Sequence, residues 1–465
     1  MKKIKLRLPV LTIVFLTFVC SGSAQTKFQK WQQPSYFRGF DVGYYCDEGE
    51  CEKTQQDFYD MKTFGANLAQ INVYAEGFRE IEYPYDVNDE GIELISEMVD
   101  FCKNAELYYT IAVRSGPGRY DVSDDLESPI WHKDSTNTVA MYGKMLKEIA
   151  QEFADDTLFV GLNLTVEPDP FGTQGYEPAE LKTALLENEI DLYGIYKTWI
   201  DSVRSFDTEL PLLVQAVNWS DPEYWGDEVF IKKQNDPFIV YDVHSYNPYD
   251  LFTHALPMNS ATYPVNDWCV TTDDYETWDS VLYADVIFSF VKDFQQTNDV
   301  PIFLGEFGMW WPQNNGEEYL NDLYEIAIDN QWHFALWTWR ADTALEYPSY
   351  NYELFDEVSS VSYYLETVQD MFPEYWNDIE NVSIEKNNIK IYPNPSDGDF
   401  FIRTDLTGKL NLHIYNAFGE NIYTEEYFSN GISQHKNIRF TGSPGIYIIR
   451  INSGEKRYRA VVVKN

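Results

Sequence analysis

Eight short apolar runs alternate with helical stretches over residues 25–378, and this alternation constrains the fold more than any other feature. The helical spacing is clear where Phe58, Met61 and Phe64 precede Gly65, a residue type that commonly ends a helix. Repeated strand–helix units favour a parallel sheet, and eight of them predict an α/β fold, the (β/α)8 TIM barrel. The predicted strands are Phe37–Val42, Asn67–Val73, Tyr108–Val113, Leu158–Val166, Leu212–Val217, Phe238–His244, Pro301–Gly305 and Phe334–Trp339.

The end of the chain has a different pattern, in which short alternating strands are separated by turn residues. This pattern predicts a small C-terminal β-sandwich. We therefore expect a barrel domain at residues 25–378, a linker at 379–388 and the sandwich at 389–465. The predicted strands of the sandwich are Ile389–Tyr392, Asp399–Arg403, Leu410–Tyr415, Gly445–Ile451 and Tyr458–Val463.

Residues 1–24 have the three parts of a secretory signal peptide. A basic start is followed by the apolar stretch Leu8–Cys20 and by the small residues Gly22–Ala24, after which we expect cleavage. The apolar stretch is too short to span a bilayer, so we expect an exported protein without a membrane span.

Four cysteines follow the predicted signal peptide, and in an oxidising compartment they allow three disulfide connectivities. The short spacing of Cys46 and Cys51 favours a local bridge between them. Cys102 lies on the apolar face of a predicted helix. It could be a buried free thiol or form a second bridge, to Cys269, and the free thiol is at least as good an explanation.

The charge of the chain excludes several classes of partner. Its 465 residues contain 75 acidic and 34 basic side chains, for a net charge of −41. Nucleic acids and anionic membrane surfaces require a basic surface, whereas a neutral substrate is compatible with this charge. The acidic run at residues 86–91 resembles a calcium loop only in outline, and an acidic helix start explains it better. We expect no metal and no organic cofactor.

Chemically active side chains follow several of the predicted strands, and the carboxyl ends of barrel strands meet at one mouth. Two carboxylates about 5–5.5 Å apart can cleave a glycosidic bond with retention of configuration, and tryptophan offers a flat face to sugar C–H groups. The candidates are Glu167 after the fourth strand, His244 and Tyr246 at the sixth, Glu306 after the seventh, and Trp337 and Trp339 at the eighth.

Four segments resemble glycoside hydrolase family 5: FRGFDVG (Phe37–Gly43), YDVHSYNPYDLFTHAL (Tyr241–Leu256), PIFLGEFG (Pro301–Gly308) and ALWTW (Ala335–Trp339). The resemblance implies that Glu306 is the nucleophile and Glu167 the general acid/base. It also implies that His244 and Tyr246 shape the cleavage subsite, with Tyr246 near the nucleophile. Trp339 would form the sugar platform, with Trp337, of the same strand parity, as the reserve candidate.

The sequence departs from the family pattern at three positions. Val166 stands where an asparagine usually precedes the acid/base, and Gln70 where the second strand usually carries an arginine. Arg114 follows the third strand, which usually ends with a histidine, and we hypothesise that it restores the positive charge near Glu306. Asn218, after the fifth strand, is a candidate sugar contact, although a loop-capping role explains it better.

The tail carries a second resemblance. IKIYPNPSDGDFFI (Ile389–Ile402), GIYIIRI (Gly445–Ile451) and KRYRAVVVK (Lys456–Lys464) are similar to the C-terminal sorting domain of the type IX secretion system. The resemblance implies a partnership with that machinery and a secreted or cell-surface location. An ordinary carbohydrate-binding sandwich is the alternative, but the tail lacks tryptophan.

Together these features predict a secreted retaining hydrolase that cleaves a β-linked polysaccharide of the glucan or mannan type. The alternative is a cell-surface barrel that binds glycan without cleaving it. The departures at Val166 and Gln70 favour that alternative, and the two intact glutamates favour catalysis. Transglycosylation, which differs only in the acceptor, also remains open.

Overall fold

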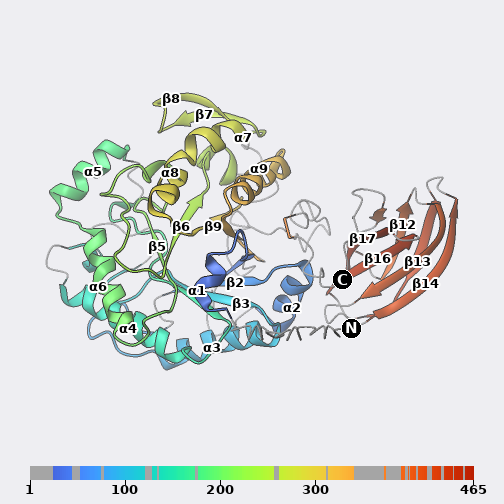
Figure 1. Cartoon of the computed structure of the whole chain (residues 1–465), viewed down its shortest axis with the longest axis horizontal. Helices are drawn as coiled ribbons and strands as arrows, with labels where there is room; N and C mark the ends of the chain where they lie inside the picture. The colour runs from blue at the N-terminus through green and yellow to red at the C-terminus, as the bar shows by residue number, and fades with distance from the viewer. Residues whose placement is uncertain are drawn as a thin grey trace, which may run out of the picture.

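A computed structural model gives the structure of the chain (Figure 1). It describes residues 25–43, 53–74, 78–120, 128–132, 136–172, 176–255, 261–309, 313–339, 371–372, 389–392, 396, 398–404, 407–415, 421–430, 434–442, 445–453 and 456–464. The predicted signal peptide, the predicted linker and the predicted Cys46–Cys51 bridge lie outside these residues.

The eight predicted strands form a closed barrel in which every pair of neighbours is parallel, and this confirms the predicted barrel. Around the barrel they follow the order β1-β10-β9-β6-β5-β4-β3-β2. Three strands, β4, β5 and β10, end earlier than predicted, because the backbone leaves the ladder of hydrogen bonds as it enters the mouth. The strands are β1 (Arg38–Gly43), β2 (Leu68–Val73), β3 (Tyr108–Val113), β4 (Phe159–Asn163), β5 (Leu212–Gln215), β6 (Ile239–Ser245), β9 (Ile302–Phe307) and β10 (His333–Leu336).

Helices surround the barrel, and two of them show how the sequence sets their ends. Gly65 closes α2 (Gln55–Phe64) with φ of 114°, a left-handed conformation that glycine adopts without strain. Asn88 begins α3 (Asp89–Asn104), where its side chain accepts a hydrogen bond from the amide of Gly91, as the acidic helix start predicted. The other helices are α1 (Lys27–Trp31), α4 (Thr136–Glu152), α5 (Pro178–Glu187), α6 (Leu192–Arg204), α7 (Ser280–Leu282), α8 (Ser289–Asn298) and α9 (Gly316–Asp329).

The inside of the barrel changes from apolar to polar along its axis. At the end where the strands begin, α1 adds Phe28 and Trp31 to an apolar cluster that includes Phe37 and Phe303. Nearer the carboxyl ends, the buried positions are polar and are held by side-chain hydrogen bonds. One end of the barrel is therefore a packed core, and polar chemistry is confined to the other.

Trp31 is the centre of the apolar end, and removing it tests this division. The side chain is 1% exposed, its ring lies 4.5 Å from that of Phe37, and its indole N–H donates to the carbonyl oxygen of Val160. We expect Trp31→Ala to lower the free energy of unfolding by about 3–5 kcal/mol, because a large cavity replaces the ring. Denaturant titration measures this change. The exposed Phe206 serves as control, and a loss at Trp31→Ala no larger than at Phe206→Ala would contradict the account.

A two-stranded antiparallel hairpin of β7 (Val265–Cys269) and β8 (Asp274–Trp278) interrupts the connection between β6 and α8. The sequence analysis did not predict it. Its inner face is buried through Val265, Cys269 and Trp278, and Figure 1 shows it at the edge of the barrel beside α7. Short helical turns η4 (Pro222–Tyr224) and η5 (Tyr249–Thr253) lie in the loops around it.

The tail forms two antiparallel sheets whose inner faces share one hydrophobic cluster, which confirms the predicted sandwich. Phe400, Ile402 and Ile438 contribute from one sheet, and Leu412 and Ile449 from the other. The sequence analysis missed β14 and β15, whose polar side chains weaken the alternation. The strands are β11 (Ile389–Tyr392), β12 (Asp399–Thr404), β13 (Thr407–Tyr415), β14 (Asn421–Asn430), β15 (Gln434–Arg439), β16 (Gly445–Ser453) and β17 (Lys456–Lys464).

Cys102 and Cys269 are both buried free thiols. The alternative of a second disulfide between them is therefore wrong, and the interpretation of Cys102 as a buried free thiol is confirmed. Within the described residues, no helix is both long and apolar enough to cross a bilayer.

Candidate active site

Glu306, on β9, is held by three side chains from the ends of two other strands, β3 and β6. Its side chain is buried, and one carboxylate oxygen, Oε1, accepts a 2.7 Å hydrogen bond from Arg114 Nη1. The other oxygen, Oε2, accepts from the hydroxyl of Tyr246 at 3.2 Å and lies 3.6 Å from His244 Nδ1. The predicted proximity of Tyr246 and Arg114 to Glu306 is thus present in the structure.

Glu167 lies four residues beyond the end of β4, in a backbone conformation with φ of 50°. Backbone contacts hold it there: its amide donates to Gln215 Oε1 at 2.6 Å, and Arg119 Nη2 donates to its carbonyl oxygen at 3.0 Å. Arg119 also donates to the carbonyl oxygen of Val166 at 2.6 Å. Arg119 is fully buried, so this guanidinium fixes the direction in which Glu167 enters the mouth.

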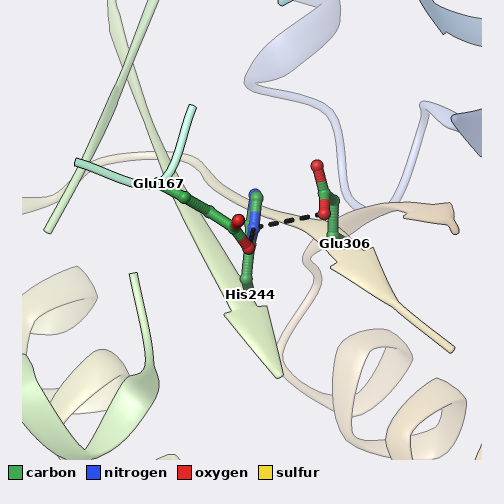
Figure 2. A group of neighbouring side chains, drawn as sticks. All are labelled: Glu167, His244 and Glu306. Carbon is green, nitrogen blue, oxygen red and sulfur yellow. Dashed lines mark hydrogen bonds and ion pairs between the residues drawn. The ribbon is translucent and has the colours of Figure 1, made fainter. Parts of the chain in front are cut away.

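His244 lies between the two glutamates (Figure 2). Its Nδ1 is 2.9 Å from Glu167 Oε1. One ring nitrogen of His244 and one carboxylate oxygen from each of Glu167 and Glu306 all lie within 4.8 Å of one another. The two carboxylates, which are 139 residues apart in the sequence, therefore face one another across a gap the size of a single sugar ring carbon and its substituents. This is the juxtaposition that the strand ends predicted.

Beneath Glu306 is a buried amide and carboxyl network that the sequence analysis did not identify. Asp41 Oδ1 accepts hydrogen bonds from Gln70 Nε2 at 2.9 Å and from Asn72 Nδ2 at 2.8 Å. Asn72 Oδ1 in turn accepts from Arg114 Nη1 at 2.9 Å. Gln70 thus supports Asp41, and the positive charge beside Glu306 comes from Arg114, at the place where we hypothesised it.

A second network supports His244, on the side of the site where Glu167 lies. Gln215 Nε2 donates to Asp242 Oδ2 at 2.6 Å and lies 3.0 Å from His244 Nε2, while Asn163 Nδ2 donates to Asp242 at 2.7 Å. The signal for both networks was present in the sequence. Asp41, Gln70 and Asp242 occupy inward positions of predicted strands, where a polar residue in an otherwise apolar run needs a partner.

The two tryptophans of the last strand separate, and this corrects the sequence analysis. Trp339, the predicted sugar platform, is fully buried, with its ring 4.9 Å from that of Phe40 in the core outside the barrel. Trp337 is partly exposed and lies over Arg114, whose Cζ is 4.7 Å from the ring centroid. The parity argument failed because β10 ends at Leu336, so strand alternation does not continue through these positions. Trp337 is the aromatic face at the site.

Asn218 lies in the turn after β5, with φ of 57°, and its carbonyl oxygen accepts from the amide of Asp221. This conformation fits the loop-capping interpretation, and contact with a sugar stays a prediction. Val166 is fully buried, so it presents no polar group where the family pattern has asparagine.

The surroundings of the site shift the pKa values of Glu306, Glu167 and His244 in different directions. Burial raises the pKa of Glu306, and Arg114 and His244 offset this only in part. Burial also acts on Glu167, but the hydrogen bond from His244 and the charge of Arg114 outweigh it, and the pKa of Glu167 is lowered. Burial opposes a charge on His244, yet the carboxylates of Glu306 and Asp242 raise its pKa well above the ordinary value. The directions of these two shifts favour a proton on His244 over one on Glu167.

The spacing of Glu167, His244 and Glu306 is also one that a cation could use. Arg114 already supplies the positive charge there, because Nη1 lies 2.7 Å from Glu306 and Nη2 lies 3.6 Å from Glu167.

Solved structures share this fold at low sequence identity. A hyperthermophilic endo-β-1,4-glucanase, solved in complex with substrate, aligns with a TM-score of 0.55 and 16% identity over 74% of this chain and 100% of that chain. An endoglucanase from Thermotoga maritima aligns with a TM-score of 0.54 and 14% identity over 75% of this chain and 100% of that chain. A family 5 lichenase from Caldicellulosiruptor aligns with a TM-score of 0.56 and 18% identity over 80% of this chain and 98% of that chain.

Among curated proteins, the chain is similar to Endoglucanase H of Acetivibrio thermocellus, with 22% identity over 298 residues. The match covers 62% of this chain and 28% of that protein, so the chain spans about a quarter of its relative. The family model for the secretion system C-terminal sorting domain matches residues 390–465. The model named "Cellulase (glycosyl hydrolase family 5)" matches residues 27–343, which hold every residue of the site described above. The chain therefore belongs to glycosyl hydrolase family 5.

Proposed function

We propose that the protein is a retaining β-glycoside hydrolase in which Glu306 is the nucleophile and Glu167 the general acid/base. The observation that carries the proposal is the pair of carboxylates, which approach within 4.8 Å. Retaining enzymes need about 5–5.5 Å, whereas inverting enzymes leave about 6.5–9.5 Å for a water molecule between the carboxylates.

In the first step, a Glu306 oxygen attacks the anomeric carbon while Glu167 gives a proton to the glycosidic oxygen. The bond to the leaving sugar breaks, and a covalent glycosyl–Glu306 ester forms. Arg114 and Tyr246 already bond the carboxylate of Glu306, so they fix its orientation for attack. Trp337 offers its exposed ring to the sugar beside the cleaved bond.

In the second step, Glu167 takes a proton from a water molecule, whose oxygen attacks the anomeric carbon from the side that the leaving sugar vacated. The ester to Glu306 breaks and its carboxylate is restored. Two inversions give a product with the original configuration.

The proton of the first step is shared between Glu167 and His244. In the free site we place it on His244 Nδ1, which lies 2.9 Å from Glu167 Oε1, because the neighbouring carboxylates raise the pKa of His244. A sugar oxygen next to Glu167 draws the proton across this hydrogen bond. The pair loses its last proton at one joint pKa, which lies at or above the pKa that either member would have with its partner deprotonated.

This sharing predicts the pH dependence of His244→Gln. In the wild type, the basic limb of kcat/KM reports the joint pKa of the pair, which the raised pKa of His244 places high. In the variant, Glu167 must hold the proton alone, so the basic limb moves to lower pH. A pH profile of initial rates for both proteins measures the shift. A basic limb that stays in place or moves to higher pH would show that Glu167 titrates alone.

For the substrate we propose a β-linked glucan or mannan. The structural neighbours include an endo-β-1,4-glucanase, a lichenase and an endoglucanase solved with mannotriose. A neutral polymer also suits a chain of net charge −41. The sorting domain supports export through the type IX machinery to the cell surface or medium.

The direct test is a panel of β-1,4-glucan, mixed-linkage glucan, mannan and xylan, with reducing ends measured over time and product sizes recorded. We expect release from at least one polymer. If no polymer yields more reducing ends than buffer, while one of them is bound, the glycan-binding alternative replaces hydrolysis. Products larger than the substrate would instead point to transglycosylation.

A further inference from the structure

The hairpin β7–β8 carries two large aromatic rings on the face that points away from the barrel. Its inner face is buried, as usual for a hairpin that packs on a domain, through Val265, Cys269 and Trp278. On the outer face, Trp268 is 38% exposed and Tyr275 is 64% exposed. A solvated strand face normally carries polar residues, and a contiguous exposed apolar patch marks a binding surface.

The two rings form one feature. Trp268 and Tyr275 are direct partners across the hairpin, with ring centroids 5.6 Å apart and planes at 78°. The rings therefore form a corner, in which one plane can lie under a sugar and the other stand beside it. The next pair on the same face is Asn266 and Thr277, both exposed, which add an amide and a hydroxyl next to the rings. Aromatic faces with neighbouring uncharged hydrogen-bonding groups match the alternating C–H and O–H groups of a sugar.

The hairpin is continuous with the catalytic mouth. Glu223 Oε1 accepts from the amide of Thr271, in the hairpin turn, at 2.8 Å, and Glu223 Oε2 accepts from Asn247 at 3.3 Å. Asn247 is the neighbour of Tyr246, which bonds the carboxylate of Glu306. The hairpin turn is thus fixed to the segment that shapes the cleavage point.

Aromatic side chains also lead from that point toward β7. The ring of His254 lies 5.2 Å from that of Tyr246 and stacks at 3.7 Å on Tyr249, which is 47% exposed. Tyr249 belongs to η5, and η5 packs against β7.

The charge of the hairpin restricts the ligand. Asp267 and Glu276 are direct partners across the strands, and Asp274 lies at the turn. Within the described part of the chain, none of these three carboxylates forms an ion pair. Asp267 and Glu276 lie on the opposite face of this thin hairpin from Trp268 and Tyr275, but their charges still repel an anionic polymer, whereas they do not repel a neutral one.

We propose that the outer face of the β7–β8 hairpin is a second glycan-binding surface, which holds a neutral polysaccharide chain outside the catalytic mouth. The inference rests on the proposed function for the class of ligand. It adds a site that the catalytic residues do not require.

The test compares Glu306→Gln with Glu306→Gln carrying Trp268→Val and Tyr275→Val, because valine keeps the strand preference and removes the rings. Native gels containing hydroxyethylcellulose, mixed-linkage β-glucan or glucomannan give the apparent affinity from retardation. We expect the hairpin variant to bind at least one of these neutral polymers about tenfold more weakly, from the loss of two ring contacts. Phe206→Val, an exposed ring at the opposite end of the barrel, is the matched control and should bind like the parent.

Three results would overturn the proposal. The first is equal retardation of the parent and the hairpin variant, and the second is tighter binding to carboxymethylcellulose than to the neutral polymers. The third is a melting temperature so reduced in the hairpin variant that unfolding accounts for its lost binding. The same substitutions in the active enzyme give a second measurement. The rate on polymer should fall relative to the rate on a short oligosaccharide, and an equal fall in both would mean that the rings only stabilise the hairpin. Failure of the proposed function is distinct, because the active parent would then release no reducing ends.

Discussion

Glu306→Gln is expected to reduce polysaccharide hydrolysis by about 10⁴-fold or more, since the amide cannot form the glycosyl ester on which both steps depend. The substitution changes one oxygen to nitrogen, so the side chain still fills its buried position between Arg114 and Tyr246. Substrate binding should therefore persist while turnover is lost. Reducing-end release under saturating polymer, together with retardation in polymer gels, separates the two quantities.

Glu148→Gln is the matched control for this variant. Glu148 pairs with Arg79 at 2.7 Å on α4, outside the site, so the same chemical change again weakens an arginine–carboxylate pair. We expect its turnover to equal that of the wild type. If Glu306→Gln kept more than about a tenth of wild-type turnover, Glu306 would not be the nucleophile.

Arg114→Ala is expected to lower kcat/KM by about 10²–10³-fold, the cost of losing a charged donor at the reacting carboxylate. Arg114 bonds Glu306 and Asn72 and lies against Trp337, so its removal loosens the nucleophile and the aromatic face together. It also removes the charge that opposes the raised pKa of Glu306. That pKa therefore rises further. As the pH falls, Glu306 becomes protonated at a higher pH than in the wild type, so the acidic limb of kcat/KM moves to higher pH.

Arg114→Lys and Arg79→Ala complete this experiment. Lysine keeps the charge but cannot reach Glu306 and Asn72 with one planar group, so we expect activity between the wild type and the alanine variant, with less shift of the acidic limb. Arg79→Ala breaks a partly buried pair away from the site and should alter stability without moving the limb. Full turnover by Arg114→Ala would reject the compensating role of Arg114.

The sequence was sufficient for the barrel because hydrophobic periodicity reports burial, and the strand ends of a barrel converge by topology. That is why Glu167, His244 and Glu306 could be placed together from positions far apart in the chain. Arg114 could be placed near Glu306 because the third strand was correctly bounded. These predictions depend on where a strand ends and not on what surrounds each side chain.

The parts that failed depend on local geometry that periodicity does not encode. Trp339 was assigned to the mouth because alternation was extended past Leu336, where the strand ends. The hairpin of β7 and β8 was missed because its outer face mixes aromatic and polar residues and shows no clean alternation. The raised pKa of His244 was also beyond reach, since it arises from three carboxylates, those of Glu167, Asp242 and Glu306, which meet His244 only in the folded chain.

The most direct test of the central claim is to trap the covalent intermediate. The enzyme is incubated with a 2-deoxy-2-fluoro glycoside of a sugar that the polysaccharide panel shows to be cleaved, with a good leaving group, and the protein is then analysed by mass spectrometry. We predict a mass increase of one fluorinated glycosyl unit, located by peptide mapping on Glu306 and absent from Glu306→Gln. An active enzyme that stays unlabelled, or that carries the label on another residue, would contradict the assignment of Glu306 and Glu167 as a retaining pair.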